Sequence, residues 1–277
     1  MIDTERAAPC FVCGGTRFEH RDGVADLCLD CKLLINRSTR PLDYADGGGQ
    51  AVPDEQKMFW RLRNAAMRLD LLKPYLAGHR VLVDIGCGSG EMLEAATEMF
   101  EHRFGFDTNG PLIRYIRDRS NATVFQSHFD PALLPQSVIG LGKVFTLSHV
   151  LEHLESPLSL IASIRDAMES GDILYVEVPL HTGQSFREQG FDWTLWNHEH
   201  LALYSPEALR RIADHSRMTM LHHGTRIFAR GSYSGKTRLK LFFRSPLEFF
   251  KAIWRKGRHS IADLMIADYG CLILRKP

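Results

Sequence analysis

The sequence lacks a long apolar run, a leader-like start and a strong net charge of either sign. No stretch of 18 apolar residues occurs in the chain, so no transmembrane helix is expected. The opening M-I-D-T-E-R-A-A-P-C lacks the charged and then apolar pattern of a secretory signal. The net charge is only +1, although it conceals a basic segment near the C-terminal end. We therefore expect a cytoplasmic protein.

The composition is otherwise that of an ordinary globular protein. Hydrophobic residues make up 44% and charged residues 24% of the chain. A length of 277 residues accommodates one α/β domain of about 200 residues and a small appendage. The six cysteines are few, and in the cytoplasm they favour metal ligands or buried thiols over disulfides.

Four of the cysteines form two C-x-x-C pairs near the N-terminus. Cys10 and Cys13 are separated from Cys28 and Cys31 by 14 residues that are typical of a short hairpin. Two such pairs supply four thiolates in a tetrahedron, the closed geometry of structural zinc. The spacing therefore predicts a zinc-ribbon-like module over residues 1–45. Its zinc has no open position for chemistry and serves to fold a segment too small for its own core.

Residues 81–90, V-L-V-D-I-G-C-G-S-G, predict a strand followed by a glycine turn and a helix. Glycine allows backbone conformations that other residues avoid and lets the main chain lie against a ligand. The next helix offers unpaired N–H groups at its N-terminus. The spacing is D-x-G-x-G-x-G, which differs from the G-x-G-x-x-G of dinucleotide-binding folds.

This turn, with Asp84 before the glycines, resembles motif I of the class I S-adenosylmethionine-dependent methyltransferases. A second acid, Asp107, ends the next predicted strand 17 residues after Gly90, where it can accept hydrogen bonds from both ribose hydroxyls. The resemblance implies S-adenosylmethionine as cofactor. The residues that it places at the cofactor are Asp84, Gly86, Cys87, Gly88, Gly90, Asp107, Ser148 and His149.

Strands and helices alternate along most of the chain. Strands are predicted at 80–85, 102–106, 122–126, 143–148, 172–178, 217–223 and in the closing D-Y-G-C-L-I-L-R-K-P, and helices at 54–76, 91–100, 111–119, 157–168 and 206–215. This order predicts an α/β fold, a seven-stranded, mostly parallel Rossmann-like sheet covered on both faces, over residues 46–277. Seven strands with a final edge strand match the methyltransferase topology.

The segment H-V-L-E-H-L after the fourth strand of this sheet carries His149 and His153. Methyltransferases that resemble this chain often have such a segment, with the first histidine near the methionine part of the cofactor. On a helix the four-residue spacing would also suit a metal pair. No third ligand is evident from the sequence, and a metal at this pair is not expected.

A second histidine segment, His198-Glu199-His200, follows the fifth strand among Trp193, Trp196 and Tyr204. With E-x-P upstream it resembles bacterial sugar C-methyltransferases, which also carry an N-terminal four-cysteine module. The resemblance implies that His200, a group that titrates near neutrality, removes a proton next to a sugar keto group, assisted by Glu199 and His198. The aromatics would line a wet, sugar-binding surface. The alternative is that the segment orders the loop and caps the next helix.

Two departures from that family leave the acceptor atom open. The family's tyrosine is Asn197 here, and the family's second Rossmann-like C-terminal domain is missing because this sequence ends at Pro277. We therefore expect a shortened relative that methylates carbon or oxygen on a sugar, a glycan precursor or a related small molecule, carried on a nucleotide or a lipid. For O-methylation, the proximity of the acceptor to the sulfonium would supply much of the rate.

A basic insertion at about 226–260 separates the last two predicted strands. Residues 225–260 contain ten Lys and Arg against one acid, and 246–258 form an amphipathic pattern with aromatics. A lid or dimer helix, peripheral contact with a membrane, and contact with nucleic acid are the three interpretations. The last underlies the alternative of an RNA methyltransferase whose zinc module and insertion bind phosphates. No N/D-P-P-Y-type motif supports it, so nucleic acid is not the expected partner. A non-catalytic scaffold is the third function class.

Overall fold

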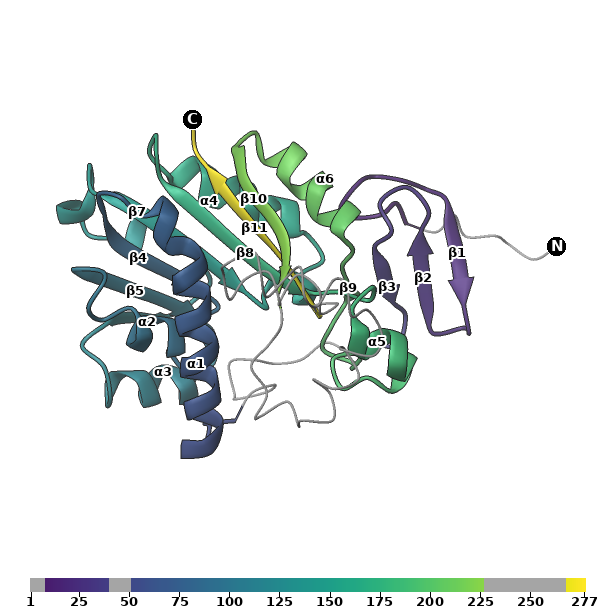
Figure 1. The fold of residues 1–277 in the computed structure, drawn as a ribbon, viewed down its shortest axis with the longest axis horizontal. Helices are drawn as coiled ribbons and strands as arrows, with labels where there is room; N and C mark the ends of the chain where they lie inside the picture. The colour runs from purple at the N-terminus through teal and green to yellow at the C-terminus, as the bar shows by residue number, and fades with distance from the viewer. Residues whose placement is uncertain (1–7, 40–50, 227–267) are drawn as a thin grey trace, which may run out of the picture.

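The structure is a computed structural model that describes residues 8–39, 51–226 and 268–277 (Figure 1). The predicted domain boundary at residue 46 and the basic insertion, apart from Arg226, lie outside the described residues. Within the described ranges, no helix combines the length and the apolar character needed to cross a lipid bilayer.

The larger of two sheets has the predicted seven strands, which confirms the Rossmann-like fold. Its order is β10-β11-β8-β7-β4-β5-β6, with β11 antiparallel to both neighbours and the other pairs parallel. The strands are β4 (His79–Ile85), β5 (His102–Asp107), β6 (Thr123–Gln126), β7 (Gly142–Ser148), β8 (Ile173–Pro179), β10 (Thr219–Arg226) and β11 (Tyr269–Arg275). Each predicted strand is present to within a few residues.

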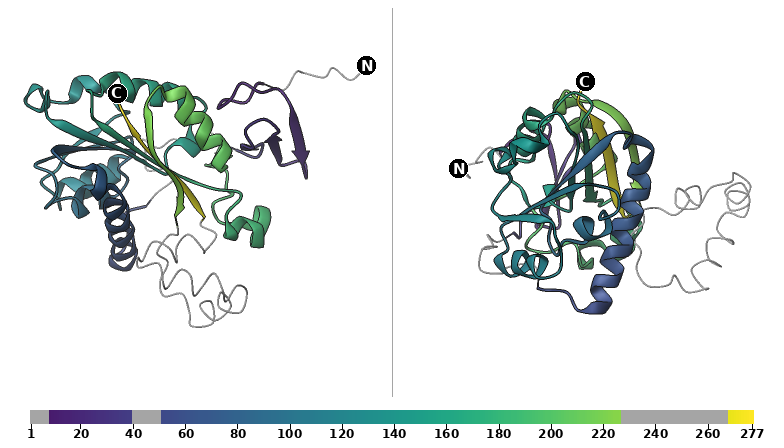
Figure 2. Two further views of the ribbon diagram at one scale, coloured as in Figure 1. Left: turned by 45° about the horizontal axis from the view of Figure 1, so that its top comes forward. Right: turned by 90° about the vertical axis from the view of Figure 1, so that its left-hand side faces the viewer.

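Helices cover both faces of this sheet (Figures 1 and 2). Helices α1 (Glu55–Leu72), α2 (Glu91–Ala95) and α3 (Gly110–Arg117) pack on one face, and α4 (Pro157–Ala167) and α6 (Pro206–Ser216) on the other. Successive side chains of a strand point to opposite faces. Leu82 of β4 accordingly packs with the first group, and Val81 and Val83 with the second.

Helix α2 is shorter than the predicted 91–100. The guanidinium of Arg103 donates to the carbonyl oxygen of Leu93, at 2.6 Å, and to the Thr97 hydroxyl, at 2.7 Å. That carbonyl would otherwise accept the N–H of Thr97, which donates to Glu94 instead. A side chain from β5 therefore takes the acceptor that the next helical turn needs, and the helix ends.

The smaller sheet, of order β1-β2-β3-β9, joins the N-terminal segment to the rest of the chain. Strands β1 (Phe18–Arg21) and β2 (Ala25–Cys28) form the predicted hairpin. Strand β3 (Leu34–Asn36) pairs with β9 (Ala202–Leu203), a contact that the local pattern did not predict. The cysteine module is therefore built onto the loop that follows β8.

The aromatic residues of that loop belong to a core, which corrects the prediction of a wet sugar-binding surface. Trp193 is 1% exposed and packs with Leu27 and Leu34 of the module, and Tyr204 is fully buried. The Tyr204 hydroxyl donates to the Leu151 carbonyl at 3.1 Å. A short helix, α5 (Gln184–Gln189), adds Phe186 to this cluster. The loop after β8 is thus held by apolar packing against the module.

Candidate active site

The glycine turn lies between β4 and α2, and its backbone explains its composition. Gly86, Gly88 and Gly90 have φ of 71°, 53° and 80°, a region that side chains other than glycine rarely adopt. A Cβ on Gly86 would lie 2.5 Å from Cγ2 of Val150. The N–H groups of Gly86 and Cys87 donate to the carbonyl of Phe106, which ties the turn to β5. The turn therefore needs glycine and touches the segment that leaves β7.

The two predicted cofactor acids differ in their surroundings. Asp84 is 3% exposed and accepts the Thr146 hydroxyl at 2.6 Å, and burial raises its pKa to about 7. Asp107 accepts the N–H groups of Gly88 and Asn109, each at 2.8 Å, and burial raises its pKa as well. A carboxylate has about four acceptor sites, so Asp107 retains capacity for two further donors such as ribose hydroxyls.

Two other predicted cofactor residues lie under or beside the turn. The Cys87 side chain is buried towards Gly105 of β5, and burial raises the pKa of its thiol well above the ordinary range. The Ser148 hydroxyl is buried at the end of β7 and has no hydrogen-bond partner among the described residues.

His149 and His153 do not share a helix face. His149 has φ of 59°, and a short 3-10 helix, η4 (Leu151–His153), follows it. His149 Nδ1 lies 3.1 Å from Oε1 of Glu152, and Nε2 lies 3.4 Å from Oε1 of Glu177. Burial opposes its charge, but the hydrogen bonds to these two carboxylates raise the pKa of His149. The backbone reversal at His149 turns His153 towards another partner.

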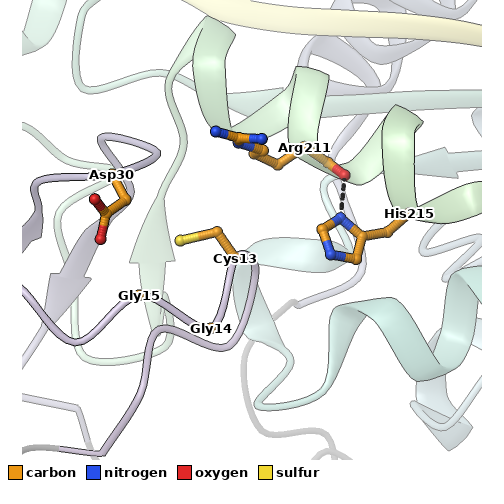
Figure 3. Close-up of a pocket in the computed structure, with 6 residues that line it drawn as sticks. All are labelled: Cys13, Gly14, Gly15, Asp30, Arg211 and His215. Carbon is orange, nitrogen blue, oxygen red and sulfur yellow. Dashed lines mark hydrogen bonds between the residues drawn. The ribbon is translucent and has the colours of Figure 1, made fainter.

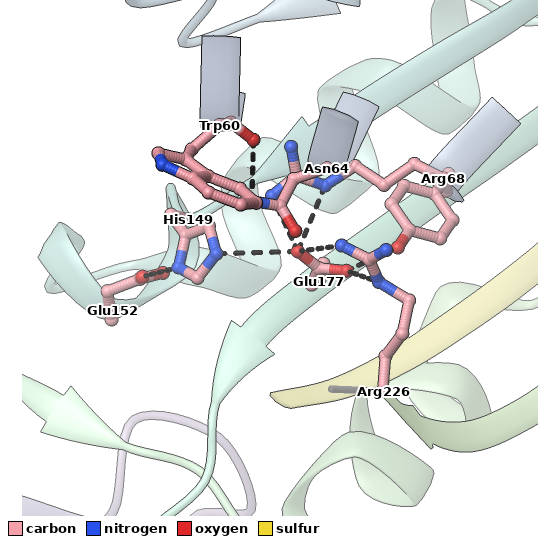
Figure 4. Close-up of polar contacts among 8 residues, drawn as sticks. Trp60, Asn64, Arg68, His149, Glu152, Glu177 and Arg226 are labelled. Carbon is pink, nitrogen blue, oxygen red and sulfur yellow. Dashed lines mark hydrogen bonds and ion pairs between the residues drawn. The ribbon is translucent and has the colours of Figure 1, made fainter. Parts of the chain in front are cut away.

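A buried ion network that the sequence did not reveal surrounds Glu177 at the end of β8 (Figure 4). Glu177 is fully buried and accepts hydrogen bonds from Arg68 of α1, Arg226 of β10 and the hydroxyl of Tyr175. Although burial opposes ionisation, the two guanidinium groups lower the pKa of Glu177 well below its usual range. The network links α1, β8, β10 and His149 in one charged cluster.

The 198–200 segment forms a turn that other residues hold. The Asn197 side-chain oxygen accepts the N–H groups of Glu199 and His200, at 2.9 and 3.2 Å. Asn36 of the cysteine module donates to the carbonyls of Asn197 and His200, at 2.8 and 3.0 Å. Asn197 thus acts as a turn residue. Of the three predicted catalytic residues, His198 is exposed, Glu199 is partly exposed and His200 is buried.

His200 lies against His153 and Glu152. The two imidazole rings meet edge to face with centroids 4.6 Å apart, and Nδ1 of His200 lies 2.6 Å from the Leu195 carbonyl oxygen. Burial lowers the pKa of His200 to about 4, whereas the sequence predicted titration near neutrality. His200 is therefore a neutral imidazole at pH 7. The structure brings His200 to η4 and leaves His198 pointing to solvent.

The four predicted zinc ligands meet at one point. Their sulfur atoms lie within 4.8 Å of one another, with Cys10 and Cys31 3.6 Å apart and Cys13 and Cys28 3.5 Å apart. Each second cysteine precedes a residue with positive φ, Gly14 in one knuckle and Lys32 in the other. Four thiols at these separations fit tetrahedral zinc with bonds of about 2.3 Å.

A pocket of about 310 Å³ lies beside Cys13 of this cluster (Figure 3), and no residue of the glycine turn lines it. It is lined by Cys13, Gly14, Gly15, Asp30, Arg211 and His215. The ring of His215 hydrogen-bonds to the Arg211 carbonyl of its own helix. The pocket separates the module from α6 and contains none of the predicted cofactor or catalytic residues.

The residues missed from the sequence had weak signals. Glu177 is an acid within the apolar strand V-E-V-P, and Arg68 occupies the buried side of α1 together with Asn64. A charged residue at a buried position indicates an ion pair. Its partner, however, lies on another element and has no fixed spacing.

Comparison with known proteins gives a family match. A family model described as a methyltransferase domain matches residues 58–223. No curated protein sequence matches the chain.

Solved structures share the fold at low sequence identity. A SAM-dependent methyltransferase from Archaeoglobus fulgidus is 20% identical over 80% of this chain and 100% of its own, with a TM-score of 0.50. The plantazolicin methyltransferase BamL, in complex with a triazolic desmethylPZN analogue and SAH, is 11% identical over 81% of this chain and 92% of its own, with a TM-score of 0.52. Because the family model spans more than half of the chain, the chain belongs to the methyltransferase domain family and is an S-adenosylmethionine-dependent methyltransferase.

Proposed function

We propose that this enzyme transfers the methyl group of S-adenosylmethionine to a sugar, a glycan precursor or a related small molecule in the cytoplasm. One observation carries the proposal: a single short segment runs from the glycine turn to the histidines. Val150 packs at Gly86, and two residues later Glu152 lies beside His200. An acceptor at His200 would therefore lie next to a cofactor on the turn.

The reaction needs an acceptor held in line with the sulfonium. The nucleophile attacks the methyl carbon, the carbon–sulfur bond breaks, and its electron pair stays on the sulfur. Positioning of this kind supplies much of the rate. We propose that the neutral His200 accepts at Nε2 the proton that the acceptor loses, because its Nδ1 is engaged with the Leu195 carbonyl. Glu199 and His198 flank this position, and both are open to solvent to some degree.

His200→Ala is expected to lower turnover at least about 100-fold while leaving S-adenosylmethionine affinity unchanged. The imidazole touches the acceptor in this proposal, and the glycine turn is separate from it. Isothermal titration with the cofactor and radiolabelled methyl transfer to a panel of nucleotide-linked sugars and glycans would measure the two effects.

His215→Ala is the matched control, because His215 is an exposed imidazole on α6. It should leave both quantities unchanged. Turnover retained by His200→Ala would contradict the role of His200. Methyl transfer to RNA with none to sugars or small molecules would contradict the acceptor class, and absence of cofactor binding would favour a scaffold protein.

We also propose that Cys10, Cys13, Cys28 and Cys31 bind structural zinc. Cys28→Ser is expected to lose one equivalent of zinc and to loosen the module, because small metal-bound segments fold with their metal. Metal analysis after dialysis would count the zinc. Cys271→Ala, which removes a buried thiol outside the cluster, should keep it. Unchanged zinc content in Cys28→Ser would refute the assignment.

A further inference from the structure

Glu152, His153 and His200 form a second cluster of candidate metal ligands. One ligand atom from each lies within 4.8 Å of the other two. Glu152 and His153 come from η4, and His200 comes from the turn that Asn36 and Asn197 hold. The cluster is mostly shielded, since Glu152 is fully buried and His200 is 6% exposed.

Both imidazoles of the cluster are oriented by backbone carbonyls. His153 Nδ1 lies 3.0 Å from the carbonyl oxygen of Glu199, and His200 Nδ1 lies 2.6 Å from that of Leu195. A carbonyl oxygen only accepts, so each Nδ1 carries the hydrogen and donates it. Each Nε2 is then the unprotonated nitrogen and carries a lone pair. Histidines that ligate metals are commonly held in this manner, with the second ring nitrogen donating to a carbonyl.

Glu152 supplies the third ligand, a carboxylate oxygen. The surroundings of its carboxylate are an independent indication of a cation site. One carboxylate oxygen, Oε1, is bonded by His149, whereas the buried Oε2 accepts no hydrogen bond from any described residue. A fully buried carboxylate oxygen without a donor is costly. A cation bound between Glu152 and the two imidazoles would give this oxygen a partner.

We propose that Glu152, His153 and His200 bind a divalent transition-metal ion that holds an oxygen of the methyl acceptor. Two histidines and one carboxylate leave coordination positions open, as in catalytic zinc and non-haem iron sites. This inference rests on the proposed function and deepens it, because it selects a hydroxyl-bearing acceptor and O-methylation. His200 Nε2 then binds the metal in place of contacting the acceptor directly.

The metal-bound hydroxyl loses its proton to solvent water more readily than a free hydroxyl, because the cation stabilises the oxyanion. The oxygen then forms a bond to the methyl carbon. The carbon–sulfur bond breaks, and its electron pair remains on sulfur as the thioether of S-adenosylhomocysteine. The metal keeps its oxidation state, and no other reactant is needed.

Zinc stoichiometry tests the site directly. After equilibrium dialysis against Zn²⁺, the unmodified chain is expected to hold two equivalents, one in the cysteine module and one in the cluster. Glu152→Gln, which keeps the side-chain shape, is expected to hold one. Glu155→Gln, an exposed glutamate three residues away, is expected to hold two. Equal zinc content in Glu152→Gln and the unmodified chain would overturn the proposal.

A spectroscopic measurement on the unmodified chain tests the site without a variant, so it does not depend on whether Glu152→Gln folds. With Co²⁺ as probe, the cysteine module gives thiolate charge-transfer absorption. The cluster is expected to add weak visible bands without thiolate character, and their absence at saturating Co²⁺ would also overturn the proposal.

Activity separates this inference from the proposed function. Removal of the second metal with a chelator should abolish methyl transfer and leave calorimetric binding of S-adenosylmethionine intact, and Zn²⁺ or Co²⁺ should restore transfer. Full turnover with one zinc would refute the metal role while the methyltransferase assignment stands. Two bound metals without any cofactor binding would refute the proposed function.

Discussion

Gly88→Asp is expected to abolish cofactor binding, with an affinity loss of at least about 1000-fold, or roughly 4 kcal/mol. Gly88 has φ of 53°, and its N–H donates to Asp107 at 2.8 Å. A side chain here strains the backbone and occupies the face along which the cofactor lies on the turn. It also adds a carboxylate beside Asp107, which would disturb the hydrogen bonds expected at the ribose. Methyl transfer should disappear with binding.

Gly78→Asp is the matched control for backbone strain. Gly78 also has positive φ, at 81°, but it precedes β4 at the opposite end of the strand, and a Cβ there meets nothing within 4 Å. This variant should bind S-adenosylmethionine as the unmodified chain does, with a modest loss of stability. Calorimetry on both folded variants decides the matter. An affinity within tenfold of normal in Gly88→Asp would mean that the cofactor does not lie on this turn.

Glu177→Gln is expected to destabilise the fold by about 3–5 kcal/mol. Glu177 is fully buried between Arg68 and Arg226, which are 3% and 7% exposed. An amide in its place removes the negative charge that faces the two buried guanidinium groups. Thermal unfolding should shift downward on the order of 10 °C. Glu101→Gln removes an exposed partner of Arg80 and should change stability by no more than about 1 kcal/mol.

The contribution of Glu177 should also depend on pH. Its pKa is lowered in the folded chain, so its stabilisation is complete above the pKa of an unfolded glutamate, about 4.3. The stabilisation is lost as pH falls from there through the lowered pKa. The difference in unfolding free energy between the unmodified chain and Glu177→Gln should therefore narrow in acid. A difference that stays constant from neutral pH to pH 3 would argue against a charged Glu177.

Local patterns were sufficient to predict the sheet and the glycine turn. The strand that ends at Asp84, the three glycines and the acid at Asp107 lie within one βαβ unit, and their spacing reflects backbone needs that the structure bears out in the positive φ of each glycine. The spacing of the four cysteines likewise predicted that their sulfur atoms lie together. Such features depend on neighbours in the sequence, and for that reason they can be read from it.

The site around His200 depends on contacts between distant segments. His153 was paired with His149 by helical spacing, but the left-handed backbone at His149 breaks that relation. His153 instead meets His200, whose turn is fixed by Asn36 from the other end of the chain. The burial that lowers the pKa of His200 also comes from tertiary packing. No periodicity encodes these contacts, since each needs the completed fold.

The pairing of β3 with β9 has a consequence for the order of events during synthesis. Leu34 and Ile35 pair with Leu27 and Asp26 of β2 along one edge, but their partners along the other edge are Leu203 and Ala202. The ribosome has therefore produced most of the protein before the small sheet can close, although all four cysteines emerged long before. During that interval β3 is an open, apolar strand edge, which is a template for pairing with other chains. Zinc bound early by the four cysteines would hold the two cysteine pairs together but would leave that edge of β3 exposed. A nascent chain stalled before residue 202 should therefore depend on chaperones to stay monomeric.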